Sequence, residues 1–205
     1  YHGLLVSPAD DWTTITIPFN STNLTQEGWG DSVALDKSLM KSFSWQSTQS
    51  ANTTTSLLID DVRCSNYTRP ESSSSIQSSS SSTSIIDTPL IDDFADNNMT
   101  NYWDGAWYTY TDANHDGSSI ISMEIANGYL TADYTIGNNL EYNFVGIGAT
   151  LNTTGAIQDL SSCTEISYKY KGAPHRFKAE QESVLDYDYH GLLVSPADDW
   201  TTITI

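Results

Sequence analysis

The chain has 205 residues, of which 26 are acidic and 8 are basic, so its formal net charge is −18. Phosphate binding requires clustered Lys and Arg, and this charge therefore argues against a nucleic-acid partner and against an anionic membrane surface. The sequence contains no apolar run of about 18 residues, so we expect no membrane span.

The chain begins and ends with the same phrase, YHGLLVSPADDWTTITI. The two copies occupy residues 1–17 and 189–205, so they start 188 positions apart. Either a segment was duplicated in cloning, or the chain is a window on a tandem array with a period of 188 residues, and we expect the array. On this interpretation, residues 1–66 are the C-terminal part of one β-sandwich module. Residues 67–87 are a linker, and residues 88–205 are the N-terminal and middle part of the next copy.

The predicted linker lies in NYTRPESSSSIQSSSSSTSIIDTP, residues 66–89. Its dense serines and few apolar residues are typical of a spacer rather than of a packed element.

The segments on both sides of the linker have the period of two that indicates β-strands. LMKSFSWQS and SLLIDDVRC precede the linker, and EYNFVGIGATL, TEISYKYKG and HRFKAEQ follow it. The Asn127-Gly128 pair predicts a hairpin turn. In the second copy of the repeated phrase we expect a hairpin that turns at 196–199. No stretch has a convincing amphipathic helix, so the sequence predicts an all-β jelly-roll sandwich.

Several phrases also occur in the order seen in a known family. They are LIDDFADNNMTNYWDGAWYTYTDANHDGSS, FVGIGATLN, ISYKYKGAPHRFKAE, DYDYHGLLVSPADDWTTITIPF, QEGWG and SLLIDDV. In this order they resemble family 11 carbohydrate-binding modules, which are galactose-binding-like jelly rolls related to the complex I intermediate-associated protein family. The resemblance implies a non-catalytic domain that binds β-glucan on a concave sheet face, often with structural calcium.

Aromatic and polar residues that could form a sugar-binding platform occur in the phrases NYWDGAWYTYTD, HRFKAEQ and DYDYH. Sugar rings stack their C–H faces on aromatic rings, and their hydroxyl groups need polar partners. Trp and Tyr also form the core of many sandwiches, so this alternative stays open. The candidate ligand residues are Trp107, Tyr108, Tyr110, His175, Arg176, Asp188 and Tyr189.

Two groups of acidic residues are candidate calcium sites. The phrase DANHDG places Asp112, Asn114 and Asp116 at alternate positions of a tight loop, where oxygen ligands can converge on a hard cation. Met123 stands where an EF-hand needs glutamate, so this is not an EF-hand. The alternative is a polar loop of turn-forming residues.

The second group comes from the phrases LIDDF and LIDDV, which begin and end the predicted module. If these strands pair, the carboxylates of Asp92, Asp93, Asp60 and Asp61 come together, and a cation would relieve their repulsion. The alternative is that these acids protect the edge strands from pairing with another sheet.

The cysteines and the composition indicate an extracellular location. Ser, Thr, Asn, Tyr and Trp are abundant, and we expect Cys64 and Cys163 to form a disulfide, either within a module or between two modules. Six Asn-x-Ser/Thr sequences are candidate glycosylation sites, at Asn20, Asn23, Asn52, Asn66, Asn98 and Asn152.

No catalytic motif occurs in the sequence, and we predict that the chain is not an enzyme. Two functions remain. The first is a secreted module that binds β-glucan as part of an array, and the second is a subunit of an extracellular fibre that contacts neighbouring copies of itself.

Overall fold

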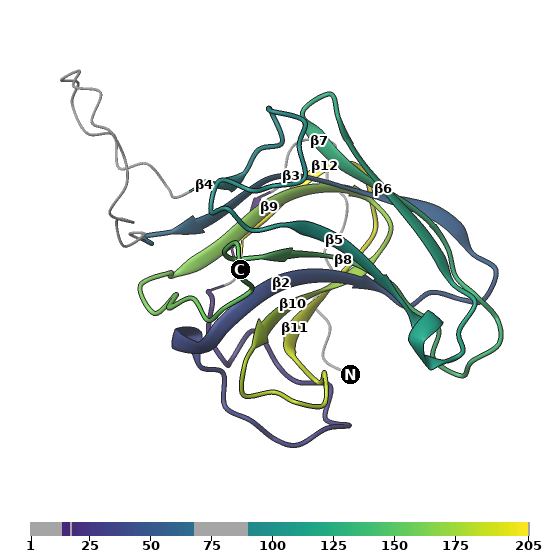
Figure 1. Ribbon diagram of the computed structural model, residues 1–205, viewed down its shortest axis with the longest axis horizontal. Coiled ribbons are helices and arrows are strands. Elements are labelled where there is room, and N and C mark those ends of the chain that lie inside the picture. Colours follow the sequence, from purple (N-terminus) through teal and green to yellow (C-terminus); the bar gives the residue numbers. More distant parts are fainter. Residues whose placement is uncertain (1–13, 17, 68–89, 205) are drawn as a thin grey trace.

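A computed structural model describes residues 14–16, 18–67 and 90–204. Most of the first copy of the repeated phrase and nearly all of the predicted linker lie outside these residues. Figure 1 shows two packed layers of strands, antiparallel except for one short parallel pair, which confirms the predicted all-β sandwich. The only helical elements in the described ranges are the 3-10 turns Lys37–Leu39 and Asp112–His115, and neither is long or apolar enough to cross a membrane.

One layer is a seven-stranded sheet in the order β1-β12-β9-β3-β7-β6, with β4 paired to β3. Its strands are β1 (Thr14–Thr16), β3 (Thr54–Ser65), β4 (Leu90–Asp92), β6 (Ile120–Ala126), β7 (Tyr129–Thr135), β9 (Glu165–Gly172) and β12 (Ala197–Thr204).

The other layer is a five-stranded sheet in the order β11-β10-β2-β8-β5. Its strands are β2 (Met40–Ser47), β5 (Trp107–Thr111), β8 (Val145–Thr150), β10 (His175–Gln181) and β11 (His190–Val194).

Both sheets contain strands from both sides of the predicted linker. In Figure 1 the purple-blue strands β2 and β3, from the early part of the chain, lie among green and yellow strands from the later part. β2 pairs with β10 and β8, and β3 pairs with β9 and β7. Residues 18–67 and 90–204 therefore build one sandwich together.

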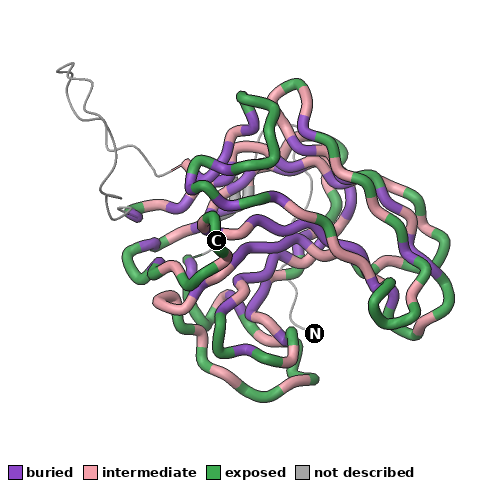
Figure 2. The backbone as a smooth tube through the Cα atoms, viewed as in Figure 1, coloured by how far each residue is buried: buried purple, intermediate pink, exposed green. Residues whose placement is uncertain are grey.

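The core lies between the two sheets, and the buried stretches follow the strands in Figure 2. The ring of Trp45 in β2 lies 5.5 Å from that of Tyr168 in β9, and Tyr168 stacks on Phe177 in β10 at 5.8 Å. The predicted alternation is confirmed here, because Tyr168 and Phe177 face inward while Arg176 and Lys178 face the other side.

Two turn predictions had different outcomes. Asn127 and Gly128 both have positive φ, 59° and 77°, and connect β6 to β7 as the predicted tight hairpin. The hairpin predicted for the second copy of the phrase is wrong. β11 pairs with β10 in one sheet and β12 pairs with β9 in the other, so residues 195–196 carry the chain between the layers.

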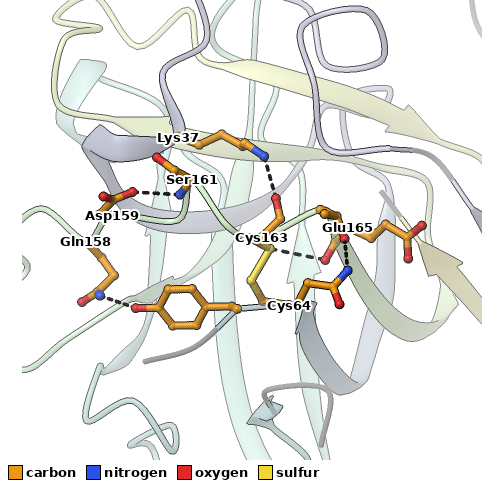
Figure 3. The surroundings of a disulfide bond; sticks show 10 residues. Lys37, Cys64, Gln158, Asp159, Ser161, Cys163 and Glu165 are labelled. Atoms are coloured by element: carbon orange, nitrogen blue, oxygen red, sulfur yellow. Dashed lines mark hydrogen bonds between the residues drawn. A yellow bond between two sulfur atoms is a disulfide. The ribbon is translucent and has the colours of Figure 1, made fainter. Parts of the chain in front are cut away.

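A disulfide joins Cys64, in β3, to Cys163, just before β9. The Cα atoms are 5.7 Å apart, and both side chains are fully buried. In Figure 3 the ammonium group of Lys37 donates a hydrogen bond of 2.6 Å to the carbonyl oxygen of Cys163. Within this chain the disulfide therefore connects residues 18–67 to residues 90–204.

Candidate functional site

The outer face of the five-stranded sheet combines two tyrosine rings with a polar network. Because side chains alternate along a strand, the residues between the core positions of β2, β8 and β10 point away from the core. β10 contributes Arg176, Lys178 and Glu180, β2 contributes Ser42, Ser44 and Gln46, and β8 contributes Gly146 and Gly148.

Tyr108 and Tyr110, in β5, lie over the two glycines of β8. A Cβ atom at Gly148 would be 2.3 Å from Cζ of Tyr108, and one at Gly146 would be 2.2 Å from Cζ of Tyr110. The two ring centroids are 6.3 Å apart. Glycine is therefore what lets both rings rest on the backbone of β8, and a larger residue at either position would displace a ring.

Glu180 is the centre of the polar network. Ser42 and Ser44 donate hydrogen bonds of 2.6 Å and 2.5 Å to its two carboxylate oxygens, and these bonds connect β2 to β10. Burial, followed by the negative charge of Glu180, raises the pKa values of Tyr108 and Tyr110 far above the ordinary value of tyrosine. Both tyrosine hydroxyls therefore stay protonated and can donate a hydrogen bond at physiological pH.

Gln46 joins the other polar groups of this face. Its Oε1 atom accepts a hydrogen bond of 2.8 Å from the ammonium group of Lys178 and one of 3.4 Å from the hydroxyl of Tyr110. Burial lowers the pKa of Lys178. Tyr189, just before β11, lies close enough to Glu180 that this charge adds to burial in raising the pKa of Tyr189 to about 12. The face thus offers donors and acceptors beside aromatic rings.

A loop at residues 25–31 borders this face beside Arg176. The Arg176 guanidinium donates to the carbonyl oxygen of Thr25, and its Nε atom lies 3.7 Å from the carboxylate of Glu27. Asp188 accepts hydrogen bonds from the backbone N–H groups of Glu27, Gly28 and Gly30 at 2.8–3.1 Å. Burial alone would raise the pKa of Asp188, but these backbone N–H groups outweigh it and lower the pKa.

The same loop, together with residues 32–35, Asp188 and His190, lines an open pocket of about 440 Å³. Burial lowers the pKa of His190, so the imidazole is neutral at physiological pH. The carboxylate of Asp188 holds the loop in place through the three backbone hydrogen bonds it accepts, and these leave the carboxylate little capacity to contact a ligand.

The structure brings together only part of the predicted ligand set. Tyr108, Tyr110 and Arg176 lie on the outer face, and Tyr189 lies beside it. Asp188 is buried under the loop at its border. The polar residues of β2, together with Lys178 and Glu180, were not predicted. In β2 the polar residues alternate with Phe43 and Trp45, and in β10 Lys178 and Glu180 alternate with Phe177 and Ala179. This alternation is the signal in the sequence that places them on the outer face.

Trp107 and His175 are corrections to the predicted ligand set, because both side chains point into the core. The indole of Trp107 stacks on that of Trp45 with ring centroids 5.5 Å apart, and its N–H donates a hydrogen bond of 2.7 Å to the carboxylate of Asp92. Nε2 of His175 lies 2.9 Å from the hydroxyl of Tyr168, and burial lowers the pKa of His175 to about 4. Each is the sequence neighbour of an outward residue, and neighbours in a strand face opposite sides.

The two LIDD phrases lie on neighbouring strands, since β3 pairs with β4 and places Val62 opposite Asp92. The side-chain cation of Lys169 approaches Asp60 at 3.9 Å and Asp61 at 3.2 Å, and Arg63 lies 2.6 Å from Asp61. Protein cations therefore neutralise part of the charge at this place.

The DANHDG loop separates its predicted ligands. Asp112 is buried and accepts hydrogen bonds from the backbone and hydroxyl of Ser119 and from the backbone of Phe144, at 2.6–3.1 Å. Asn114 and Asp116 are exposed. The part of the chain that the structure describes contains no group of three or more His, Cys, Asp or Glu side chains arranged to hold a metal ion. Calcium stays a prediction.

Asp92 gives a testable pH dependence of stability. Burial raises its pKa to about 6, above the ordinary value of 3.8. As pH rises from 4 to 7.5, the unfolded chain releases this proton more easily than the folded chain, so Asp92 lowers the free energy of unfolding by about 2–3 kcal/mol. Asp92→Asn cannot titrate, so we expect the difference between the wild-type and variant free energies, from urea unfolding, to change by that amount. Parallel pH profiles would contradict this assignment.

The candidate glycosylation sites are accessible to different degrees. Asn20, Asn52, Asn66 and Asn98 are exposed, and Asn23 and Asn152 are partly buried. Their modification stays a prediction.

Comparisons with known proteins give one partial likeness. No protein-family model matches the chain, and no solved structure matches it. The chain is 31% identical over 117 residues to Endoglucanase 3 of Fibrobacter succinogenes. The matched stretch covers 49% of this chain and 17% of that relative, so the chain spans about one sixth of the relative's length.

Proposed function

We propose that the chain is a non-catalytic module that binds a polysaccharide of β-glucan type on the outer face of the five-stranded sheet. The observation that carries this proposal is the pair of tyrosine rings supported by Gly146 and Gly148. Aromatic rings held in place by the backbone present flat apolar faces to the C–H faces of sugars. The likeness to part of an endoglucanase supports a glucan as the ligand.

The polar groups beside the rings suit the hydroxyl groups of a neutral sugar chain. Lys178 and Arg176 can donate hydrogen bonds, the remaining lone pairs of the Glu180 carboxylate can accept them, and all three side chains lie on the same face. Specific binding sites combine an apolar surface with a few placed polar groups in this way. The net charge of −18 disfavours an anionic polymer, which supports an uncharged glucan.

The arrangement of acids supports binding rather than hydrolysis. Glycosidases need two carboxyl groups that flank the bond, about 5–10 Å apart, with one free to give a proton. Glu180 has both oxygens engaged by Ser42 and Ser44, and Glu27 lies beside Arg176.

The disulfide is consistent with an extracellular location, where such bonds persist. Joined copies of a weak site would gain avidity on a polymer.

Native gel electrophoresis with embedded polysaccharide tests the proposal. We expect gels that contain mixed-linkage β-glucan or hydroxyethyl cellulose to slow the protein relative to a non-binding standard, and gels that contain starch to leave its mobility unchanged. A reducing-end assay on the same glucans should show no hydrolysis. Unchanged mobility in all β-glucan gels would overturn the proposed ligand, and released reducing ends would overturn the non-catalytic assignment.

A further inference from the structure

We propose that residues 18–67 are an exchangeable part of the sandwich, which one copy of the chain can supply to residues 90–204 of another copy. The Cys64–Cys163 disulfide then fixes covalently which copy supplies it. The proposed interaction surface is the pair of gaps that β2 and β3 fill, and the partner is a second copy of this chain. This inference does not depend on what the outer face binds.

Neither part has a complete sheet without the other. Withdrawing residues 18–67 would separate β10 from β8 in one sheet and β9 from β7 in the other, because β2 and β3 lie between them. The gaps would expose backbone N–H and C=O groups on both sides, which is a strong template for a strand of matching sequence. Only another copy of residues 18–67 carries both strands in the required order.

The side chains at these gaps make the match specific. Trp45 fits between Trp107 of β5 and Phe177 of β10, with ring centroids at 5.5 Å and 5.7 Å. Leu57 and Ile59 of β3 are buried in the same core. An exchanged copy would restore these contacts without strain, because every contact is the one already present within the chain. Exchange of an identical element is a low-cost route to association for this reason.

The chain length between the two parts allows the exchange. Residues 68–89 join them, and a segment of 22 residues can reach about 75 Å when extended. A domain of this size has a radius of gyration of about 17 Å, so two sandwiches in contact have centres roughly 40 Å apart. Residues 18–67 can therefore reach a neighbouring molecule while staying attached to their own chain.

Because of the repeated phrase, a copy of residues 18–67 could enter the sandwich either after β1 or after β12. β1 pairs in parallel with β12, and Thr14 lies opposite Thr202, its own counterpart 188 positions later. Residues 14–16 and 202–204, which match in the two copies, therefore lie side by side. Phe19 then joins the sandwich, because its backbone N–H donates a hydrogen bond of 3.0 Å to the carbonyl oxygen of Thr164. In an array with this period, a part that followed β12 directly would start at the same place, and head-to-tail exchange would build an open fibre.

The disulfide lies across the boundary between the two parts. Cys64 belongs to residues 18–67, Cys163 belongs to residues 90–204, and both are buried at the end of the β3–β9 pairing. When the two parts meet as reduced thiols, a small-molecule disulfide such as oxidised glutathione can accept two electrons and two protons from them. The protein disulfide forms and two small thiols are released. The bond then prevents the parts from separating.

The experiment uses the wild-type chain in unlabelled and nitrogen-15-labelled forms. Equal amounts are unfolded, reduced, mixed and refolded in a glutathione buffer at 1 μM and at 200 μM. Mass spectrometry of the Cys64–Cys163 peptide pair then counts pairs with one labelled and one unlabelled half. We expect few hybrid pairs at 1 μM, and at 200 μM a rise toward the one half that complete random exchange would give. Dimers isolated by gel filtration should have the near-ultraviolet circular dichroism of the monomer.

A matched pair of variants provides a second measurement. Cys64→Ser keeps only Cys163, and Cys163→Ser keeps only Cys64, so a disulfide between these two chains forms with native geometry only after exchange. We expect the refolded mixture to give more disulfide-linked dimer than either variant alone. The absence of hybrid pairs at both concentrations would overturn the proposal. So would cross-linked dimers that lack the native circular dichroism, or Cys64–Cys64 pairs as abundant as Cys64–Cys163 pairs.

Discussion

Replacing both Tyr108 and Tyr110 with alanine is expected to remove nearly all retention of the protein by β-glucan gels. Each ring offers a flat apolar surface held by a glycine beneath it, and the loss of both should cost about 2–3 kcal/mol of binding free energy. That cost corresponds to a rise in Kd of roughly 30- to 150-fold. Affinity electrophoresis over a series of glucan concentrations measures this change.

Thr109→Ala is the matched control for this double variant. Thr109 lies between the two tyrosines in the same strand, and its side chain faces the opposite side. We expect its Kd to stay within about twofold of the wild-type value, and thermal melting should show that all the proteins are folded. Equal retention of the double variant and the wild type would show that the tyrosine pair does not contact the glucan.

Trp45→Ala is expected to cause the largest loss of stability among single substitutions in the core. The indole is 1% exposed and packs against Trp107, Tyr168 and Phe177. Truncating a buried tryptophan removes its transfer free energy and leaves a cavity, which together cost about 3–5 kcal/mol. With a urea m-value of about 2–3 kcal/mol/M, the unfolding midpoint should fall by about 1–2 M.

Tyr142→Ala is the control for this substitution, because Tyr142 is 77% exposed. Its free energy of unfolding should stay within about 0.5 kcal/mol of the wild-type value. Both proteins are compared with the disulfide intact, so that the unfolded chains are constrained equally. A loss below about 1 kcal/mol for Trp45→Ala would mean that the core closes around the missing ring, contrary to its packing density.

The strands could be predicted because their signal is local. In TEISYKYKG, the residues Ile166, Tyr168 and Tyr170 alternate with polar ones, and the structure buries all three. The turn at Asn127-Gly128 depends only on the ease with which these two residues adopt positive φ. Information of this kind is complete within a few residues, so one sequence is enough to predict it.

The candidate site could be predicted only in part, because it depends on which strands become neighbours. Ser42 and Glu180 are 138 positions apart, and nothing in either phrase indicates that β2 pairs with β10. Trp107 and His175 were grouped with their sequence neighbours, although strand alternation places them on the opposite side of the sheet. The crossing between sheets after Val194 also escaped prediction, since alternation does not identify the partner of a strand.

Because the ends of β1 and β12 lie side by side, residues 18–67 could be joined after residues 90–204 instead of before them. A circular permutant could start at Leu90, continue from Thr204 through one residue to Pro18, and stop at Tyr67. Its first and last strands, β4 and β3, would lie hydrogen-bonded to each other, as they do now. The same surface would then be displayed by a protein whose two ends emerge together at one corner, which suits it to fusion or to display on a scaffold.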